Sequence, residues 1–556
     1  MHIPATQHAV QLVGPDELRL NTAKSVPRPG AHQVLCRVEV CGLCFSDLKL
    51  LKQFSAHARK SPVLSGVDAQ VLEEIPAYVP GAAPTVPGHE TVVQAVAVGP
   101  QVRRYRVGER YLVQTDWRWL RTAGSNAAFG YNFEGALQEY VLLDERIVVS
   151  PQDESMLLPV ARGKAASAIA LCEPWACVEE AYAVRERSAL KPDGALLIVA
   201  EAEVPAAALQ NLFSSFDLPR TVTWLARSPA PATWRLPVES IAALDSAPDA
   251  AFDDVIYFGA NAGTVEALFA KLAAHGLLNL CLCGGQFGRP VVTALGRVHY
   301  GGLRLTGTPG ATPADGWRRI PATGEIRKND RVNVIGAGGP MGVMHVVRNL
   351  CQGIHGVSVY AGDLSDERLA ALTAIAGPLA VRHGLGYHPY NARTSFPAGV
   401  AFDYAAVMAP APALVAAAVA QAAPRGLINI FAGIPAHVTG PVDLDAYVQK
   451  GCYFIGTSGS TLADMLVVKQ KVESNRLDTN VSVAAVAGLD GAVEGIRAVE
   501  QQLISGKIMI YPACKGLGVT PLSRLAETHP AVFQCLANGL WNLRAEEALL
   551  AAYAGG

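Results

Sequence analysis

The sequence predicts a mixed fold, β-rich in its first part and α/β beyond it, with two tandem doubly wound parallel sheets. Three observations predict this fold class. Residues 1–150 hold short β-rich runs that are separated by Gly and Pro turns. From about residue 188, apolar strands alternate with Ala-rich helical stretches, a pattern typical of βαβ units. Two parts of this alternating region also resemble each other at a nearly constant spacing, which indicates a duplicated domain.

Composition and charge narrow the classes of function. The chain has 556 residues, 50% of them apolar and 17% charged, which excludes global disorder. Its 46 Lys and Arg against 48 Asp and Glu leave a net charge of −2, so no positive field draws in nucleic acid or an anionic membrane. No apolar run reaches the roughly 18 residues of a membrane span. The 11 scattered cysteines suit a reducing compartment, so we expect a cytoplasmic protein without nucleic-acid or membrane partners.

Within the β-rich region, the expected strands are Val34–Val40, Thr91–Val98 and Leu137–Leu143. Residues 160–187 predict a helix that carries the sequence LCEPWACVEEAY. The Pro-rich stretch 55–86 has no periodicity and predicts a long loop, which could serve as a lid or an oligomer contact. The end of the chain predicts a helix and strand, then a helical tail.

The duplication rests on spaced matches between two segments that begin at Phe252 and Phe402. Glycines and asparagines recur 150 positions apart, and the motif GTPGAT recurs as GTSGST 149 positions later. Chance similarity among Ala-rich helices is the alternative. We expect one α/β domain over 188–325 and a second over 326–465. The other matched residues are Gly276 with Gly426, Asn279 with Asn429, and Gly307 with Gly456.

A glycine-rich turn in the second α/β domain indicates a dinucleotide site. The apolar strand Val332–Ile335 runs into GAGGPMG and then into a helical sequence. Glycines allow the backbone to turn tightly and approach a pyrophosphate, and the helix N-terminus supplies free N–H groups. The spacing is A-x-G-x-x-G rather than G-x-G-x-x-G, which by itself is a weak signal. The predicted coenzyme contacts are Gly336, Ala337, Gly339, Pro340, Met341 and Gly342.

A carboxylate at the end of the next strand strengthens this prediction. Asp363 lies 21 residues after Gly342, where it can bind the ribose hydroxyls of NAD and repel the 2′-phosphate of NADP. The alternative is an N-cap on the following helix. In the first α/β domain, the strand Leu196–Val199 is followed by AEAEVP, which has no glycine and two carboxylates. Like charges would repel a pyrophosphate, so we expect this copy not to bind a dinucleotide.

Three segments hold residues that can bind a metal ion. Cys44 lies in CGLCFSDLK, His89 and Glu90 lie in PGHE, and Glu173 lies in CEPWAC. A thiolate, an imidazole and a carboxylate form a plausible ligand set for a catalytic zinc with one open position. Each signal alone is ordinary, because a lone Cys in a β-rich region is usually core and Gly-His-Glu is usually a turn.

In this order, ahead of a nucleotide-binding pattern, these residues resemble the zinc-dependent medium-chain dehydrogenase/reductase family, particularly its sorbitol and threonine dehydrogenase-like branch. The segment YNFEGALQEYVLLDERIV at 131–148 resembles the family's sequence before the catalytic helix, and the GAGGPMG turn resembles the L-sorbose-1-phosphate reductase kind. The resemblance implies a GroES-like zinc catalytic domain over 1–187, a degenerate Rossmann-like domain over 188–325 and an NAD-binding Rossmann domain over 326–465. Residues 466–556 would return to the catalytic domain and add a helical tail.

The resemblance also implies roles for single residues. Cys44 and His89 match the first two zinc ligands, and either Glu90 or Glu173 would ligate or lie behind the ligands. Asp47 would support the loop of the zinc site, and Ser46 would begin a proton relay. The further matches are Lys49, which stands where the family often has a relay His and could instead bind an anionic substrate, and Gly433 and Ile434, at the nicotinamide end.

Other departures from the family pattern bear on the metal and on the domains. Residues 116–135 contain no cysteine, so the lobe that holds a structural zinc is absent and we expect a single zinc. The degenerate copy is inserted before the NAD-binding one, and the tail beyond Pro512 exceeds the usual end of the family.

The resemblance implies a zinc-dependent oxidoreductase that moves hydride between NAD and a secondary alcohol of a polyol, sugar, cyclitol or sugar phosphate. Two other readings remain open at this point. One is an epimerase or lyase that retains NAD and uses transient oxidation, and the other is a non-catalytic scaffold. The family also implies a homodimer or homotetramer, although the first copy could instead imitate a partner subunit within one chain.

Overall fold

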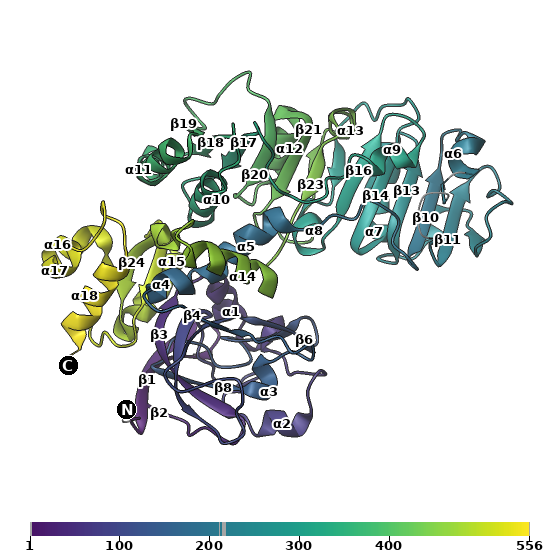
Figure 1. Cartoon of the computed structure of the whole chain (residues 1–556). Coiled ribbons are helices and arrows are strands. Elements are labelled where there is room, and N and C mark those ends of the chain that lie inside the picture. The colour runs from purple at the N-terminus through teal and green to yellow at the C-terminus, as the bar shows by residue number, and fades with distance from the viewer. Residues whose placement is uncertain (1–2, 211, 214–217, 555–556) are drawn as a thin grey trace. The chain divides into compact units, whose positions relative to one another are not determined.

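A computed structural model of the chain describes residues 3–210, 212–213 and 218–554, and it divides into two compact units (Figure 1). The first unit comprises residues 1–176 and 460–556, and the second comprises residues 177–459. Among the described residues, no helix has the length and apolar character to cross a membrane.

The first unit is built on a mixed sheet that strands from both ends of the chain form together. Its order is β26-β24-β25-β3-β4-β5-β9, and β8 pairs with β3 beside this path. The strands are β3 (Gln33–Gly42), β4 (Glu90–Val98), β5 (Arg110–Val113), β8 (Tyr140–Asp144), β9 (Leu157–Pro159), β24 (Val483–Ala487), β25 (Lys507–Ile510) and β26 (Thr520–Pro521). Two smaller antiparallel pairs are β1 (Thr6–Gly14) with β2 (Glu17–Ser25), and β6 (Asp116–Arg121) with β7 (Asn126–Ala128).

The register of three central strands brings distant residues together. Gly42 at the end of β3 pairs with Glu90 at the start of β4, and it also pairs with Met509 of β25 on its other side. The strand ends of β3, β4 and β25 therefore meet at one place in the sheet, although β25 lies more than 400 residues further along the chain.

The expected strands around Val34–Val40 and Thr91–Val98 lie inside β3 and β4. The expected strand Leu137–Leu143 is only partly right, since β8 begins at Tyr140. The long stretch 55–86 contains short helical turns and the helix α2 (Ala69–Glu73) but no strand.

The single helix predicted over 160–187 is wrong. The chain forms α4 (Ala166–Ala170), a break at Leu171, and then α5 (Cys172–Ala183). In a continuous helix, Pro174 would clash with the carbonyl of Ala170 and could not donate a hydrogen bond to it. Starting α5 at Cys172 places the proline in the first turn, where no N–H is required.

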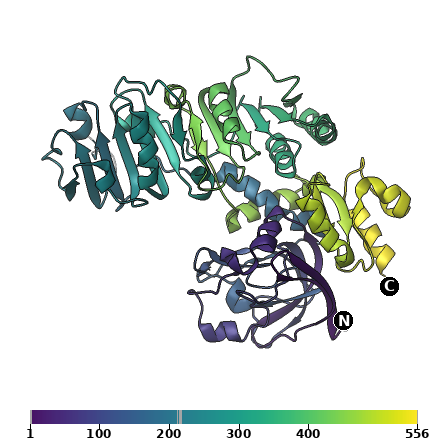
Figure 2. The same ribbon diagram turned by 180° about the vertical axis from the view of Figure 1, so that it is seen from behind.

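The second unit contains two parallel six-stranded sheets of the same topology, which confirms the duplicated α/β fold (Figures 1 and 2). The first sheet has the order β12-β11-β10-β13-β14-β16 and the second has β19-β18-β17-β20-β21-β23, both with the strand order of a Rossmann fold. Their strands are β10 (Ala195–Ala200), β11 (Thr221–Ala226), β12 (Val238–Ser240), β13 (Phe252–Phe258), β14 (Leu272–Cys281) and β16 (Arg304–Thr308), then β17 (Arg331–Ile335), β18 (Ser358–Asp363), β19 (Gly386–Asn391), β20 (Phe402–Val407), β21 (Ala422–Ile430) and β23 (Tyr453–Ile455).

The two sheets meet through corresponding edges within the second unit. Edge strands β16 and β23 lie next to each other, and apolar residues of both copies share one core. Two short strands, β15 (Val291–Thr293) and β22 (Gly440–Val442), form an antiparallel pair between the copies. The helices of this unit are α6 (Ala206–Gln210), α7 (Ala262–Lys271), α8 (Leu295–Tyr300), α9 (Pro313–Trp317), α10 (Pro340–Cys351), α11 (Asp366–His383), α12 (Pro412–Gln421) and α13 (Leu444–Lys450).

The helices of the first unit that follow or flank its sheet are α1 (Phe45–Gln53), α3 (Glu145–Val148), α14 (Leu462–Glu473), α15 (Ala492–Glu500), α16 (Leu525–Thr528), α17 (Pro530–Phe533) and α18 (Leu543–Tyr553). The expected helical tail beyond Pro512 is helical only in part, since irregular segments precede α16 and separate α17 from α18.

Candidate functional site

Helix α1 begins at the end of β3 and presents the first candidate ligand. Cys44 is its N-cap residue, and the backbone N–H of Cys44 donates to Asp47 Oδ2 over 3.1 Å. This capping arrangement holds the start of the helix in place. The Cys44 thiol is therefore positioned by local hydrogen bonds rather than by a flexible loop.

Asp47 also orients the imidazole of His89. The Asp47 Oδ1 atom lies 3.1 Å from His89 Nδ1, and both side chains are buried. Burial disfavours the charged imidazole, but the carboxylate of Asp47 outweighs it and raises the pKa of His89 well above its ordinary value. A carboxylate on one ring nitrogen fixes the tautomer that leaves the other nitrogen as a metal ligand. Here that nitrogen is Nε2, which lies 3.2 Å from Ser46 Oγ.

Cys44, His89 and Glu90 form a cluster in which one ligand atom from each lies within 4.8 Å of the others. Glu90 is fully buried. Its Oε1 atom is paired with Lys507, and its Oε2 atom has no hydrogen-bond partner among the described residues. A Cβ on Gly42, across from Glu90 in the sheet, would overlap Glu90 Oε2, so a larger residue at this position would displace the carboxylate.

This donor set fits a zinc ion. Sulfur, imidazole nitrogen and carboxylate oxygen are the ligand atoms that zinc takes in catalytic sites. A buried carboxylate oxygen without a partner is costly, and a divalent cation between it, the thiol and the imidazole would satisfy it. The three residues named from the sequence in CGLCFSDLK and PGHE are therefore brought together.

Glu173 lies outside that three-residue cluster but remains in its electrostatic environment. Burial raises the pKa of Glu173 to about 7, His89 and Lys507 oppose the rise, and Glu90 adds to it. The side chain stands on the first turn of α5, after the break at Leu171. The structure thus groups Glu90 with Cys44 and His89, while Glu173 stays a proposed alternative ligand.

Two residues of this site were missed by the sequence reasoning. Lys507 of β25 is buried, and the attraction of Glu90 overcomes the effect of burial and raises its pKa. Tyr131 is buried beside His89, with ring centroids 5.8 Å apart, and hydrogen-bonds with Ser46. Tyr131 belongs to the YNFEGALQEY segment, so only that resemblance could have drawn attention to it.

The relay position is occupied by an exposed lysine. Lys49 lies on α1 and acts electrostatically on His57 of the 55–86 stretch. Burial, followed by the cations Arg59 and Lys49, lowers the pKa of His57 to about 4. The His57 ring lies against Tyr131, with centroids 5.1 Å apart. The stretch 55–86 thus contributes side chains beside the cluster within the first unit.

In the second unit, the glycine-rich turn joins β17 to α10. Gly336 has φ +87°, a conformation that favours glycine, and Gly339 is the N-cap of α10. A Cβ on Gly342 would overlap the carbonyl oxygen of Gly336 and lie 2.7 Å from the Cα of Ala337. The glycines therefore permit the helix N-terminus to pack directly against the turn, which is the geometry that exposes backbone N–H groups to a phosphate. Pro340 and Met341 occupy the first turn of the helix.

Asp363 ends β18 and contacts the turn. Its Oδ2 accepts a hydrogen bond from Gly338 N over 2.9 Å, and its Oδ1 accepts from Leu364 N and Ser365 N. The alternative role as N-cap of the next helix is wrong, because Ser365 caps α11 through Arg368 N. The Ser365 hydroxyl caps the helix, so the Asp363 carboxylate stays at the end of β18, beside the glycine-rich turn.

Gly433 and Ile434 follow β21, as the sequence indicates. A Cβ on Gly433 would lie 2.8 Å from the hydroxyl of Tyr300, which ends α8 of the first copy. The first copy therefore borders the loop that we assign to the nicotinamide end, a contact that no local sequence pattern signals.

The equivalent turn of the first copy is filled by its own side chains. Glu201 accepts hydrogen bonds from Tyr257 Oη over 2.5 Å and from Thr264 Oγ1 over 2.7 Å. The Tyr257 ring also lies where a Cβ on Gly259 would be. A carboxylate and an aromatic ring thus occupy the end of β10, in keeping with the prediction that this copy does not bind a dinucleotide.

The comparisons with known proteins agree with this architecture. Residues 30–153 match the alcohol dehydrogenase GroES-like domain. Over 232 residues the chain is 26% identical to the L-sorbose 1-phosphate reductase of Klebsiella pneumoniae, which covers 41% of this chain and 56% of that protein. A zinc-type alcohol dehydrogenase-like protein of Escherichia coli is 26% identical over 140 residues, 22% of this chain and 35% of that protein. The chain spans little more than half the length of the first curated relatives.

Among solved structures, 2R,3R-butanediol dehydrogenase from Bacillus subtilis shares the fold, with a TM-score of 0.52 and 15% identity. The match covers 91% of this chain and all of that one. The matched GroES-like domain, the cluster of thiol, imidazole and carboxylate, and the Rossmann topology agree with one another. The chain thus carries an alcohol dehydrogenase GroES-like domain over residues 30–153, is similar to zinc-type alcohol dehydrogenase-like proteins, and has two Rossmann-like sheets in tandem.

Proposed function

We propose that the protein is a zinc- and NAD-dependent dehydrogenase that oxidises a secondary alcohol of a polyol, sugar, cyclitol or sugar phosphate, or reduces the corresponding carbonyl. The observation that supports this most is the cluster of Cys44 with the buried His89 and Glu90, because a cation there would pair the Glu90 oxygen that has no hydrogen-bond partner among the described residues. A cytoplasmic location is part of the same proposal.

The residues of the cluster would hold the metal, and their neighbours would tune it. Cys44 and His89 are the proposed ligands, with Glu90 or Glu173 as the third. Asp47 holds His89 in the ligating orientation. Lys507 balances the charge of Glu90, so that the carboxylates do not leave the site strongly negative. A zinc ion held there supplies Lewis-acid polarisation of a substrate hydroxyl, and the nicotinamide supplies the hydride acceptor.

Ser46 is the proposed start of a proton relay. Its Oγ lies 3.0 Å from Cys44 Sγ and 3.2 Å from His89 Nε2, and it hydrogen-bonds with Tyr131. A hydroxyl that both donates and accepts can pass a proton between a substrate hydroxyl and a neighbouring group. Lys49 stands where the family often has a relay histidine, and its proposed role is to bind an anionic substrate through its positive charge.

The coenzyme would lie on the second Rossmann sheet. Gly336, Ala337, Gly339, Pro340, Met341 and Gly342 form the proposed diphosphate turn, and Asp363 is the proposed partner of the adenosine ribose. A carboxylate at this position repels a 2′-phosphate, so NAD is preferred to NADP. Gly433 and Ile434 are the proposed neighbours of the nicotinamide.

A panel of polyols and sugar phosphates, each with NAD and with NADP, tests this function through the absorbance of reduced nicotinamide. We expect turnover with NAD and at least one polyol or sugar phosphate, and loss of activity in Cys44→Ser. An epimerase or lyase would give product without accumulation of NADH and would retain coenzyme through purification. A scaffold would contain no stoichiometric zinc, and that result would overturn the proposal.

A further inference from the structure

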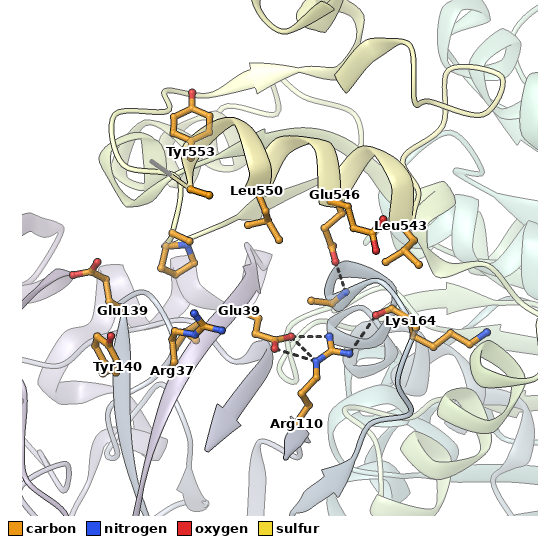
Figure 3. Close-up of a pocket in the computed structure, with 17 residues that line it drawn as sticks. Arg37, Glu39, Arg110, Glu139, Tyr140, Lys164, Leu543, Glu546, Leu550 and Tyr553 are labelled. Carbon is orange, nitrogen blue, oxygen red and sulfur yellow. Dashed lines mark hydrogen bonds and ion pairs between the residues drawn. The ribbon is translucent and has the colours of Figure 1, made fainter. Parts of the chain in front are cut away.

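Helix α18 carries a carboxylate, that of Glu546, which is buried inside the first unit. Glu546 is only 4% exposed, although it stands in the first turn of a helix near the end of the chain. Figure 3 shows it reaching from α18 towards the backbone of the segment after Lys164, at the wall of a cavity of about 650 Å³. In the same wall, Arg110 is paired with Glu39, so this charged pair is satisfied without Glu546. Glu546 must therefore find its partners elsewhere.

Its first two partners are the backbone of α4. The Oε1 atom accepts from Ala166 N over 2.6 Å, and the Oε2 atom accepts from Ser167 N over 2.9 Å. The N-cap residue of α4 is Ala165, whose side chain cannot accept a hydrogen bond. Glu546, which lies 380 residues further along the chain, therefore caps the N-terminus of α4. Seven residues after Ala166 stands Glu173, the alternative zinc ligand.

Its third partner is Tyr511, which donates to Glu546 Oε2 over 2.9 Å. Tyr511 directly follows β25, the strand that begins with Lys507. Trp541 Nε1 donates in turn to the hydroxyl of Tyr511 over 3.0 Å. One carboxylate thus joins the two segments that bring Glu173 and Lys507 to the candidate metal site.

Resting on the proposed function, we infer that Glu546 is a positioning residue for the metal centre: it fixes the α4–α5 corner that carries Glu173 and the end of the strand that carries Lys507. Removing a carboxylate that three donors share leaves buried N–H and O–H groups without an acceptor, so those segments loosen. Groups that hydrogen-bond to metal ligands change metal affinity by about 10- to 100-fold. Glu546 would act one step further out, through the segments that carry such residues. The tail beyond Pro512 would then serve the metal site rather than only extend the chain.

The test compares Glu546→Gln and Glu546→Ala with Glu547→Gln. Glu547 is the exposed neighbour on the same helix and lines the same cavity, so it is a matched control. Two readouts are taken on the full-length protein: the rate at which zinc is lost to a chromogenic chelator, and hydrogen–deuterium exchange of residues 166–176 and 507–511. We expect at least tenfold faster zinc loss and faster exchange in both Glu546 variants, with the glutamine variant less affected, and wild-type behaviour in Glu547→Gln.

The inference is overturned if Glu546→Gln folds and matches the wild type in both readouts. It is also overturned if Glu547→Gln speeds zinc loss and exchange as much as the Glu546 variants do. Exchange is also recorded on the metal-free protein, where faster exchange in the Glu546 variants tests the positioning of the two segments separately from the metal. If the wild type holds no zinc, the proposed function fails, and the role of Glu546 towards the metal fails with it even where exchange changes. Should Glu546→Ala not fold, Tyr511→Phe removes one donor only, and it is expected to speed exchange at 507–511 more than at 166–176.

Discussion

Gly342 shows how a single missing side chain shapes the coenzyme turn. Its Cα faces the carbonyl of Gly336, and any Cβ would push that backbone and the Cα of Ala337 away. These atoms belong to the backbone, so they cannot yield as a flexible side chain would. A larger residue must therefore shift the turn from the start of α10 and move the N–H groups that would face a diphosphate.

Gly342→Ala is therefore expected to weaken NADH binding at least tenfold, with zinc content unchanged. Fluorescence titration of NADH measures the dissociation constant. Gly377→Ala is the control, because Gly377 lies within α11 with open space around its Cα. It should bind NADH as the wild type does, because Gly377 lies away from the turn. Equal affinity in Gly342→Ala and wild type would contradict the assignment of the turn.

The candidate ligands could be predicted from the sequence because each lies in a short motif. Cys44 and His89 are recognisable in CGLCFSDLK and PGHE, and the structure places them with Glu90. Lys507 and Glu546 could not be predicted, since their neighbours in the chain are ordinary. Lys507 reaches Glu90 only through the pairing of β25 with β3, and Glu546 reaches the start of α4 only through the packing of α18. Both are tertiary contacts across several hundred residues.

At the scale of elements, α10 carries a buried imidazole that must stay neutral. His345 is fully buried, and its Nδ1 is hydrogen-bonded to the hydroxyl of Tyr182 over 2.8 Å. The Tyr182 oxygen also accepts a hydrogen bond from Asn349 Nδ2 over 2.9 Å. Burial, assisted by the cation of Arg348, lowers the pKa of His345 to about 3.

This shift predicts acid sensitivity of the second unit. In the unfolded chain His345 binds a proton below about pH 6.5, whereas in the folded chain it stays neutral down to about pH 3. The free energy of unfolding therefore falls as pH drops between these values, by about 2 kcal/mol at pH 5 from this residue alone. In His345→Gln that part of the loss disappears, so the stability difference between variant and wild type should change by this amount between pH 7 and 5. Denaturant unfolding at both pH values measures it, and a constant difference would contradict the neutral His345.

Element prediction succeeded where a periodic pattern or a motif was strong and failed where a proline acted locally. β3, β4 and the β17–α10 unit follow directly from apolar runs and glycines. The helix over 160–187 was wrong because the apolar pattern continues through Leu171 while Pro174 forbids an unbroken helix.

At the scale of the whole molecule, the two Rossmann sheets pair with each other in a self-complementary way. In the β15–β22 pair, Val291 faces Val442 and Thr293 faces Gly440. With the 149-residue spacing of the repeat, Val291 corresponds to Gly440 and Thr293 to Val442. Val291 thus pairs with the counterpart of Thr293, and Thr293 pairs with the counterpart of Val291. This reciprocal pairing is the pattern of an isologous dimer interface. We therefore propose that the first copy takes the place that an identical partner subunit would take.

This pattern predicts that β22 of the second copy pairs with β15 of the same chain and not with another subunit. Cysteines at the two facing positions nearest the pseudo-axis, Val292→Cys with Pro441→Cys, should form a disulfide inside the chain. Non-reducing electrophoresis would then show monomers only, and light scattering would show that any dimer or tetramer survives oxidation unchanged. Covalent dimers from the double variant would instead show that the second sheet pairs across subunits.

The central claim is that a zinc ion held by thiol, imidazole and carboxylate serves a coenzyme on the second Rossmann sheet. The most direct measurement is a crystal structure with NADH, recorded with anomalous scattering at the zinc edge. We expect one peak bonded to Cys44 Sγ and His89 Nε2, with a carboxylate oxygen of Glu90 or Glu173, and the diphosphate over the turn from Gly336 to Gly342. A structure without a peak at Cys44 and His89, or with NADH at the end of β10 beside Glu201, would contradict it.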